Sequence, residues 1–206
     1  MKSRHRLFLQ VKLACLGLCT SVVCAPVWAQ TACLVIPAFF VQKPAEVNDL
    51  DEIALNFPRE LAQKLADKTQ YRIVYHAELP VFDSLSHQAP ARALQQLSAQ
   101  YQCPYVLLGE IKGAGIYTET LLFGLWDRKW RNFTAATRIV DSRSQQTLKS
   151  HEYAQNIKGE ASPGRQLNFG GSGFATHAYG RIILEVLNDT VEALTQDLQQ
   201  LNSKKP

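Results

Sequence analysis

The stretch Pro104–Gly115, with the sequence Pro-Tyr-Val-Leu-Leu-Gly-Glu-Ile-Lys-Gly-Ala-Gly, decides the fold of this chain. Its apolar run begins at Tyr105, continues to Ile111 and ends at two glycines, which predicts a strand buried on both faces. The preceding segment, 89–100, places apolar residues at helical spacing, so a helix leads directly into this strand. We therefore expect it to be the central strand of a sheet, with the individual features of the fold beginning after its carboxyl end.

Two strands and a further helix are expected before this central strand. Residues 33–41 are a rich apolar run, with Pro37 limiting the strand or marking a bulge. The helical pattern that follows contains Pro58, which requires either a helix cap at Asn56 or a kink after a short turn. Residues 71–75 form a compact second strand. The order β-α-β-α-β predicts parallel strands with right-handed crossovers and helices packed on the sheet.

The pattern changes after the central strand. Residues 131–141 and 147–157 are rich in Thr and apolar residues and are separated by a turn-like segment, which predicts an antiparallel hairpin added to the sheet. A Gly- and Ser-bearing loop over 159–173 leads to a long amphipathic helix, 176–201. The expected fold class is α/β (α+β), with a mixed five-stranded sheet, helices packed on it and a long C-terminal helix.

The first residues of the chain have the features of a secretory signal peptide. Four basic residues precede an apolar segment too short for a comfortable membrane span, and Val27-Trp28-Ala29 fits the pattern of signal peptidase cleavage. No cysteine there follows the pattern of a lipoprotein signal. We expect residues 1–29 to be removed and 30–206 to form a single periplasmic domain without a membrane span.

Charge and length bound the class of protein further. The chain has 22 basic and 18 acidic residues, and the loss of the four basic residues of the signal would leave the two kinds in balance. A near-neutral mature chain without a stripe of Lys and Arg gives no indication of nucleic-acid binding. The length suits one domain with a proper hydrophobic core.

Two cysteines, Cys33 and Cys103, remain in the expected mature chain. Each immediately precedes an expected buried strand, and if those strands are parallel neighbours, both cysteines lie at the same edge of the sheet. An oxidising compartment favours a disulfide between them. The alternative is two buried free thiols.

No stretch carries a strong signature of catalysis, a cofactor or a metal site. None of the five histidines has a neighbouring Cys, Asp or His at metal-ligand spacing, and solvated side chains explain them better. The glycines of 109–115 lack the Gly-Lys-Ser/Thr ending of a phosphate loop, and those of 170–173 lack a partner lysine. We therefore expect no catalytic residue, cofactor or metal, and an enzyme is the least favoured class.

The segment 116–133 is unusual because it mixes aromatic and charged residues without a regular period. Aromatic residues and arginine together are typical of a protein interface. Alternatively, the segment folds back and packs its aromatic residues onto the core, with its charges in water. If it is an interface, we expect the contact residues to be Phe123, Trp126, Arg128, Trp130 and Arg131.

Several stretches together resemble one known family. They are Leu34-Val-Ile-Pro-Ala-Phe39, Pro58-Arg-Glu-Leu-Ala62, the run Ala99-Gln-x-x-x-Pro-Tyr-Val-Leu-Leu-Gly109, residues 133–141, and Gly173-Phe-Ala-Thr-His-Ala-Tyr-Gly180. They resemble the middle domain of the flagellar assembly protein T family over about 32–201. The resemblance implies a periplasmic α/β module similar to the amino-terminal domain of TolB, in a structural protein of the flagellar basal body. The chain has room for the middle module alone, so we expect a smaller accessory or a differently deployed relative.

The leading hypothesis is a non-enzymatic periplasmic scaffold or binding module that assembles or stabilises ring components of the flagellar motor. Its expected partners are other basal-body or envelope proteins, with further copies of the chain as another possibility. The first alternative is a TolB-like envelope accessory that binds outer-membrane or peptidoglycan-associated proteins. The second is an anion or small-molecule binder that uses the glycine loops of 109–115 and 170–173, if they meet at one end of the sheet.

Overall fold

The computed structural model describes residues 32–50, 52–78, 91–121, 123, 126–159 and 168–203. The expected signal segment 1–29 and most of the connection 76–88 lie outside the described residues. The elements, in chain order, are β1 (Cys33–Pro37), β2 (Phe40–Val41), the 3-10 helix η1 (Pro44–Val47), α1 (Ile53–Lys68), β3 (Arg72–His76), α2 (Ala91–Tyr101), β4 (Tyr105–Gly113), β5 (Ile116–Leu121), β6 (Trp126–Asp141), β7 (Thr147–Lys158) and α3 (Ala178–Ser203).

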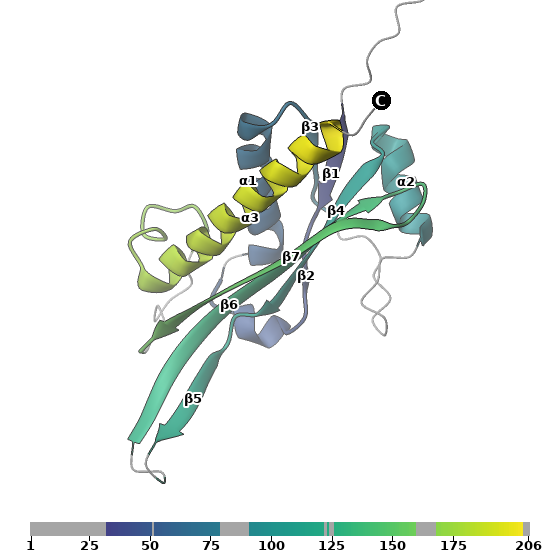
Figure 1. Ribbon diagram of the computed structural model, residues 1–206. Coiled ribbons are helices and arrows are strands. Elements are labelled where there is room, and N and C mark those ends of the chain that lie inside the picture. The colour runs from purple at the N-terminus through teal and green to yellow at the C-terminus, as the bar shows by residue number, and fades with distance from the viewer. Residues whose placement is uncertain are drawn as a thin grey trace, which may run out of the picture. The chain divides into compact units, whose positions relative to one another are not determined.

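These strands form one mixed sheet, and β4 is its central strand, as the sequence predicts. On one side β4 pairs in parallel with β1, which pairs in parallel with β3. On its other side β4 pairs antiparallel with β6, and β6 pairs antiparallel with β7 (Figure 1). The predicted fold class and the added hairpin are therefore confirmed.

The sheet has seven strands where five are expected. One additional strand, β2, arises because the first apolar run divides at Ala38 and resumes beside the far end of β4. The other, β5, lies in the segment 116–133, for which the sequence predicts an irregular connection. That prediction is wrong, because this segment is a regular hairpin of β5 and the first part of β6.

Helices cover both faces of the sheet around β4. Alternate β4 residues point to opposite faces, and Leu107 and Ile111 join the large core formed with α1 and α3. Val106 and Leu108 face the other way and pack against α2. Burial of β4 on both faces therefore follows from the position of the helices, and explains why its apolar run is continuous.

The helix α1 accommodates Pro58 without a break. A proline has no N–H to donate to the carbonyl four residues earlier, here that of Ala54. The Phe39 N–H donates to this carbonyl instead, at 2.9 Å. The helix begins at Ile53, so the expectation of a cap at Asn56 is wrong, and Asn56 is buried inside the helix.

Gly109 in the central strand allows the close packing of Phe39. A Cβ atom at Gly109 would lie 2.1 Å from the Phe39 ring, a distance that no real contact tolerates. Phe39 is fully buried and contacts Phe57 of α1, with 5.7 Å between the ring centroids. The glycine therefore serves packing within the sheet, and a register shift between Ile111 and Gly113 marks the bulge that ends the regular pairing.

Candidate functional site

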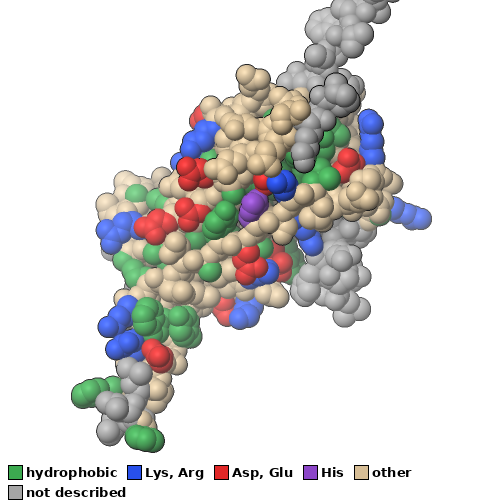
Figure 2. All heavy atoms as spheres, viewed as in Figure 1, with side chains coloured by type: hydrophobic (Ala, Val, Ile, Leu, Met, Phe, Trp, Pro, Cys, Tyr) green, Lys and Arg blue, Asp and Glu red, His purple; other side chains and the backbone are tan. Residues whose placement is uncertain are grey.

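The exposed large hydrophobic side chains of the described residues gather on one hairpin. We call the arm the part of the sheet formed by β5 and residues 126–131 of β6, which β7 joins only at its base, at residues 129–131. The four side chains are those of Ile116, Tyr117, Phe123 and Trp126, and Trp126 is 69 % exposed. Figure 2 shows their place, as green side chains among blue and red ones toward the lower end of the molecule. Such a concentration of apolar surface is typical of an interaction site.

Cross-strand pairing places the aromatic residues on one face of the arm. Tyr117 pairs with Trp130, Glu119 pairs with Arg128, and the strand ends at the pair that contains Trp126. Directly opposite residues in an antiparallel pair point to the same face, and so do residues two apart along a strand. We call this side of the arm, formed by Tyr117, Trp126 and Trp130 around Glu119 and Arg128, the aromatic face.

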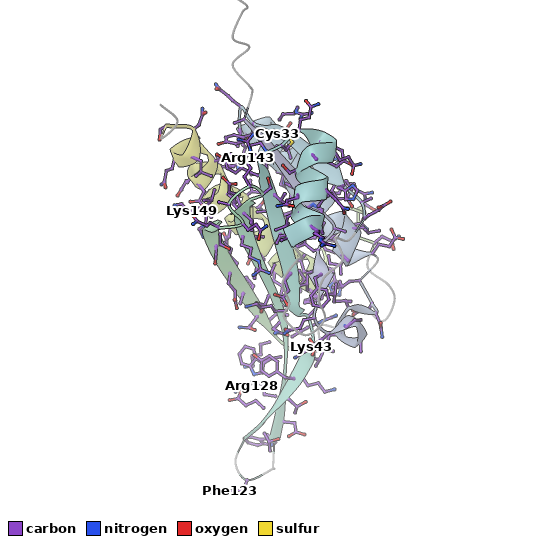
Figure 3. The ribbon with its side chains drawn as sticks, turned by 90° about the vertical axis from the view of Figure 1, so that its right-hand side faces the viewer. Cys33, Lys43, Phe123, Arg128, Arg143 and Lys149 are labelled. Atoms are coloured by element: carbon purple, nitrogen blue, oxygen red, sulfur yellow. A yellow bond between two sulfur atoms is a disulfide. The ribbon has the colours of Figure 1, made fainter. Side chains whose placement is uncertain are left out.

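A hydrogen bond orders the centre of the aromatic face. The indole Nε1–H of Trp130 donates to Glu119 Oε2 at 3.1 Å. On the opposite face of the arm, the Thr120 hydroxyl donates to Asp127 Oδ1 at 3.0 Å. Figure 3 shows Arg128 beside the arm and Phe123 at its end. The arm therefore carries both signs of charge in near balance, and its distinguishing chemistry is apolar and aromatic.

Arg131 is not on this surface. Its side chain is 2 % exposed and lies at the base of the arm, where Nη2 contacts Asp49 Oδ1 at 2.6 Å. The guanidinium also stacks over the Tyr179 ring, 3.6 Å from its centroid, and Nε–H donates to the Ala114 carbonyl. Arg131 therefore cannot make a surface contact, and it joins the arm to the start of α3 and to the segment before α1.

The sequence contains a signal for this burial. From Arg131 onward, alternate residues of β6 are buried, namely Phe133, Ala135, Thr137 and Ile139. Arg131 continues that alternation by one step, so its side chain points to the core-facing side of the strand. In the sequence this period is hidden, because Arg131 follows directly after other charged residues.

Tyr179 completes the base of the arm. Its hydroxyl lies 3.0 Å from the carbonyl oxygen of Ala114, between β4 and β5, and 3.1 Å from that of Asn132 on β6, so its single hydrogen is shared between the two acceptors. Burial raises the pKa of Tyr179 well above its ordinary value, and the Arg131 charge only partly offsets this. The hydroxyl therefore stays protonated and holds both strands at this junction.

A carboxylate occupies the glycine loop after β4. Glu46 of η1 accepts a hydrogen bond from the Ala114 N–H at 3.1 Å, and a Cβ at Gly115 would lie 2.7 Å from its carboxyl carbon. Burial would raise the pKa of Glu46, but the Ala114 hydrogen bond and the neighbouring Lys43 hold it below its ordinary value. An anion at this loop would meet a negative charge, so the geometry disfavours the anion-binding alternative there.

Two histidines expected to be solvated take part in the packing of elements. His151 of β7 contacts Asp197 Oδ2 of α3 at 2.5 Å, and Lys149 reaches the other carboxylate oxygen at 3.0 Å. His76 Nδ1 lies 2.9 Å from the Tyr101 hydroxyl. Among the described residues, no three His, Cys, Asp or Glu side chains are placed to hold a metal ion. Within the same residues, no helix has the length and apolar character needed to cross a bilayer.

A small hollow of about 160 Å³ lies on the sheet beside β2. Its lining includes Glu110, Lys112 and Glu152, and a salt bridge of 2.5 Å joins Lys112 to Glu152. Because the lysine is paired with a carboxylate of the same lining, the hollow offers no concentrated charge of one sign. It has less distinctive binding chemistry than the aromatic face.

The expected disulfide between Cys33 and Cys103 is present. Cys33 begins β1, and Cys103 lies just before β4, so the parallel pairing of these strands brings the cysteines to one edge of the sheet. Figure 3 places Cys33 at the end of the molecule opposite Phe123. The bond therefore fixes the body of the protein far from the arm.

Comparison with known proteins agrees with this architecture. Residues 29–169 match a family model described as flagellar assembly protein T, middle domain. No curated protein matches the chain significantly.

Solved structures share the fold at low sequence identity. The hypothetical protein CT253 from Chlamydia trachomatis is 11 % identical with a TM-score of 0.54, over 80 % of this chain and 96 % of that one. Protein XCC0632 from Xanthomonas campestris is 8 % identical with a TM-score of 0.52, over 87 % and 93 % of the two chains. The PelC dodecamer from Paraburkholderia phytofirmans is 12 % identical with a TM-score of 0.46, over 82 % and 91 %. At these identities the likenesses to CT253 and XCC0632 show the fold alone.

Proposed function

The chain belongs to the flagellar assembly protein T family through its middle domain, and from this premise we propose that it is a non-enzymatic periplasmic scaffold module of the flagellar basal body. In this role it binds other proteins of the motor and helps to assemble or stabilise a ring component. A secretory signal over residues 1–29 delivers the mature chain, which begins at Gln30. Family membership supports the flagellar context, and the arm supports the mode of action.

The observation that carries this proposal is the composition and exposure of the arm. Trp126 and Phe123 stand in water. Large aromatic side chains with an arginine nearby contribute most of the free energy in many protein interfaces. We propose that Phe123, Trp126, Arg128 and Trp130 contact the partner, while Arg131 holds the arm in position from within the body.

The test is co-fractionation of a tagged copy with purified hook-basal bodies, together with a swimming assay of the deletion strain. We expect stable association and impaired swimming, because a ring component acts only when assembled. The tagged copy should also be recovered from the periplasmic fraction, as a chain that begins at Gln30. Normal swimming and normal basal bodies in the deletion strain would rule out the flagellar role, and envelope defects with intact flagella would favour the TolB-like alternative.

A further inference from the structure

The outer edge of β5 has unpaired backbone groups. Two hydrogen bonds reveal their direction, since Asn132 N–H donates to the Gly115 carbonyl and Gly159 N–H donates to the Lys129 carbonyl. Backbone groups of alternate residues in a strand point to opposite edges. The even-numbered residues of β6 therefore face β5 in the arm, and their partners Tyr117 and Glu119 face back toward β6.

It follows that Ile116, Thr118 and Thr120 turn their N–H and C=O groups outward. Among the residues that the structure describes, no strand pairs with this edge and no hydrogen bond reaches these backbone groups. Beyond the end of β7 only two strands pair in the arm, and a two-stranded ribbon alone is only marginally stable in water. The outer edge of β5 thus has room for a further strand, with the aromatic face beside it.

This edge carries few of the features by which proteins protect exposed strands. Its sequence, Ile-Tyr-Thr-Glu-Thr-Leu, has high β propensity and contains neither Pro nor Lys, and its one charged residue, Glu119, accepts a hydrogen bond from Trp130 within the arm. The edge strand β7, by contrast, carries Lys149 and Lys158, and α3 packs against it through Asp197. A poorly protected edge on the same element as the exposed aromatic residues indicates a single binding surface.

We propose that β5 binds its partner by strand addition, so that an extended segment of another protein pairs with this outer edge. This inference rests on the proposed scaffold function and names the chemistry of the partner. In the partner's segment, apolar and polar residues alternate. Its apolar side chains lie on the aromatic face of the arm, and its polar side chains lie on the side of Thr118 and Thr120. It needs little charge, because Glu119 and Asp127 already accept hydrogen bonds within the arm.

A partner protein fits this surface better than a second copy of the chain. Two β5 edges paired with each other would place two aromatic faces side by side and leave both in water. A strand that belongs to a larger partner can cover the edge and the aromatic face together. Self-association is therefore an outcome that the test must detect.

The test compares Thr118→Pro with Thr118→Val, and the probe is purified hook-basal bodies. Proline removes an outward N–H without removing a hydrogen bond between β5 and β6, whereas valine keeps the N–H and the branched shape. We expect the valine variant to bind like wild type and the proline variant to bind about tenfold more weakly or worse, with unchanged thermal unfolding. If Thr118→Pro unfolds, the test is repeated at the second outward position with Thr120→Pro against Thr120→Val, because both of these variants lose the hydroxyl that bonds Asp127 and only the proline removes the N–H.

The outcomes separate the two proposals. Binding by wild type and by both proline variants would overturn strand addition and leave the scaffold function standing. Failure of the wild-type protein to bind would overturn both. Light scattering on the purified protein gives the remaining outcome, since a wild-type dimer that Thr118→Pro dissociates would identify a second copy as the occupant and overturn the proposed partner.

Discussion

Arg131 connects the arm to the body, and the contacts of this one side chain predict a large effect on stability. Arg131→Met removes the partner of Asp49 and the cation stacked on Tyr179. Because the arginine is buried and the aspartate is 30 % exposed, we expect a loss of about 3 kcal/mol in the free energy of unfolding, at the low end for a broken buried pair. Urea denaturation measures it.

The matched control is Arg128→Met, which removes the same charge from the surface of the arm. Exposed substitutions change stability by about 0.5 kcal/mol or less. Equal effects of the two substitutions would contradict the distinction between an arginine that positions the arm and one that faces a partner.

Glu46 predicts a pH dependence. Its pKa in the folded protein lies below the ordinary 4.5, so the unfolded chain binds more protons near that pH. The carboxylate therefore stabilises the fold above about pH 4.5, and this contribution is lost as the pH falls through the lowered pKa. We expect Glu46→Gln to be less stable than wild type at pH 7 and to approach it at pH 3, by urea denaturation at each pH. A difference that stays constant with pH would argue against this cause.

At the scale of elements, the disulfide should contribute strongly to the free energy of unfolding, because the chain between its two cysteines is long. Cys33 and Cys103 are 70 residues apart, and the loop-entropy model gives about 4 kcal/mol for closing such a loop. We expect Cys33→Ser/Cys103→Ser to unfold at a clearly lower urea concentration while keeping the arm's binding, because the bond lies at the far end of the sheet. An intact mass that does not change on reduction of wild type would show that the bond is absent.

The elements around β4 could be predicted from the sequence because burial imposes a pattern on them. A strand covered on both faces is a continuous apolar run, and α3 shows its buried stripe at helical spacing. The cysteine pair follows from the parallel order of β1 and β4. Each of these inferences uses a period that the hydrophobic core enforces.

The two strands of the arm could not be predicted from the sequence in the same way. Alternation between apolar and polar residues reveals a strand only when one face is buried, and both faces of the arm carry exposed side chains. Its aromatic composition indicated an interface, but not a strand or a free edge. The hydrogen bond from the Phe39 N–H to the Ala54 carbonyl, which replaces the one that Pro58 cannot donate, likewise depends on tertiary structure that no local pattern encodes.

At the scale of the whole molecule, stability and binding are assigned to different parts. The large core lies among α1, α3 and the sheet, while the exposed aromatic residues lie on the arm. Substitutions in the body should therefore change unfolding first, and substitutions on the arm should change binding first. This separation distinguishes a scaffold with a dedicated contact surface from a fold whose aromatic residues serve packing.

The most direct measurement of this claim is the affinity of purified Trp126→Ala for hook-basal bodies, with thermal unfolding recorded on the same sample. Trp126 is well exposed, so its loss should leave the melting temperature nearly unchanged. If the arm is the contact surface, binding should weaken by about 30-fold, the effect of losing an aromatic residue worth 2 kcal/mol at an interface. Unchanged binding, or a fall in binding that follows a fall in melting temperature, would contradict it.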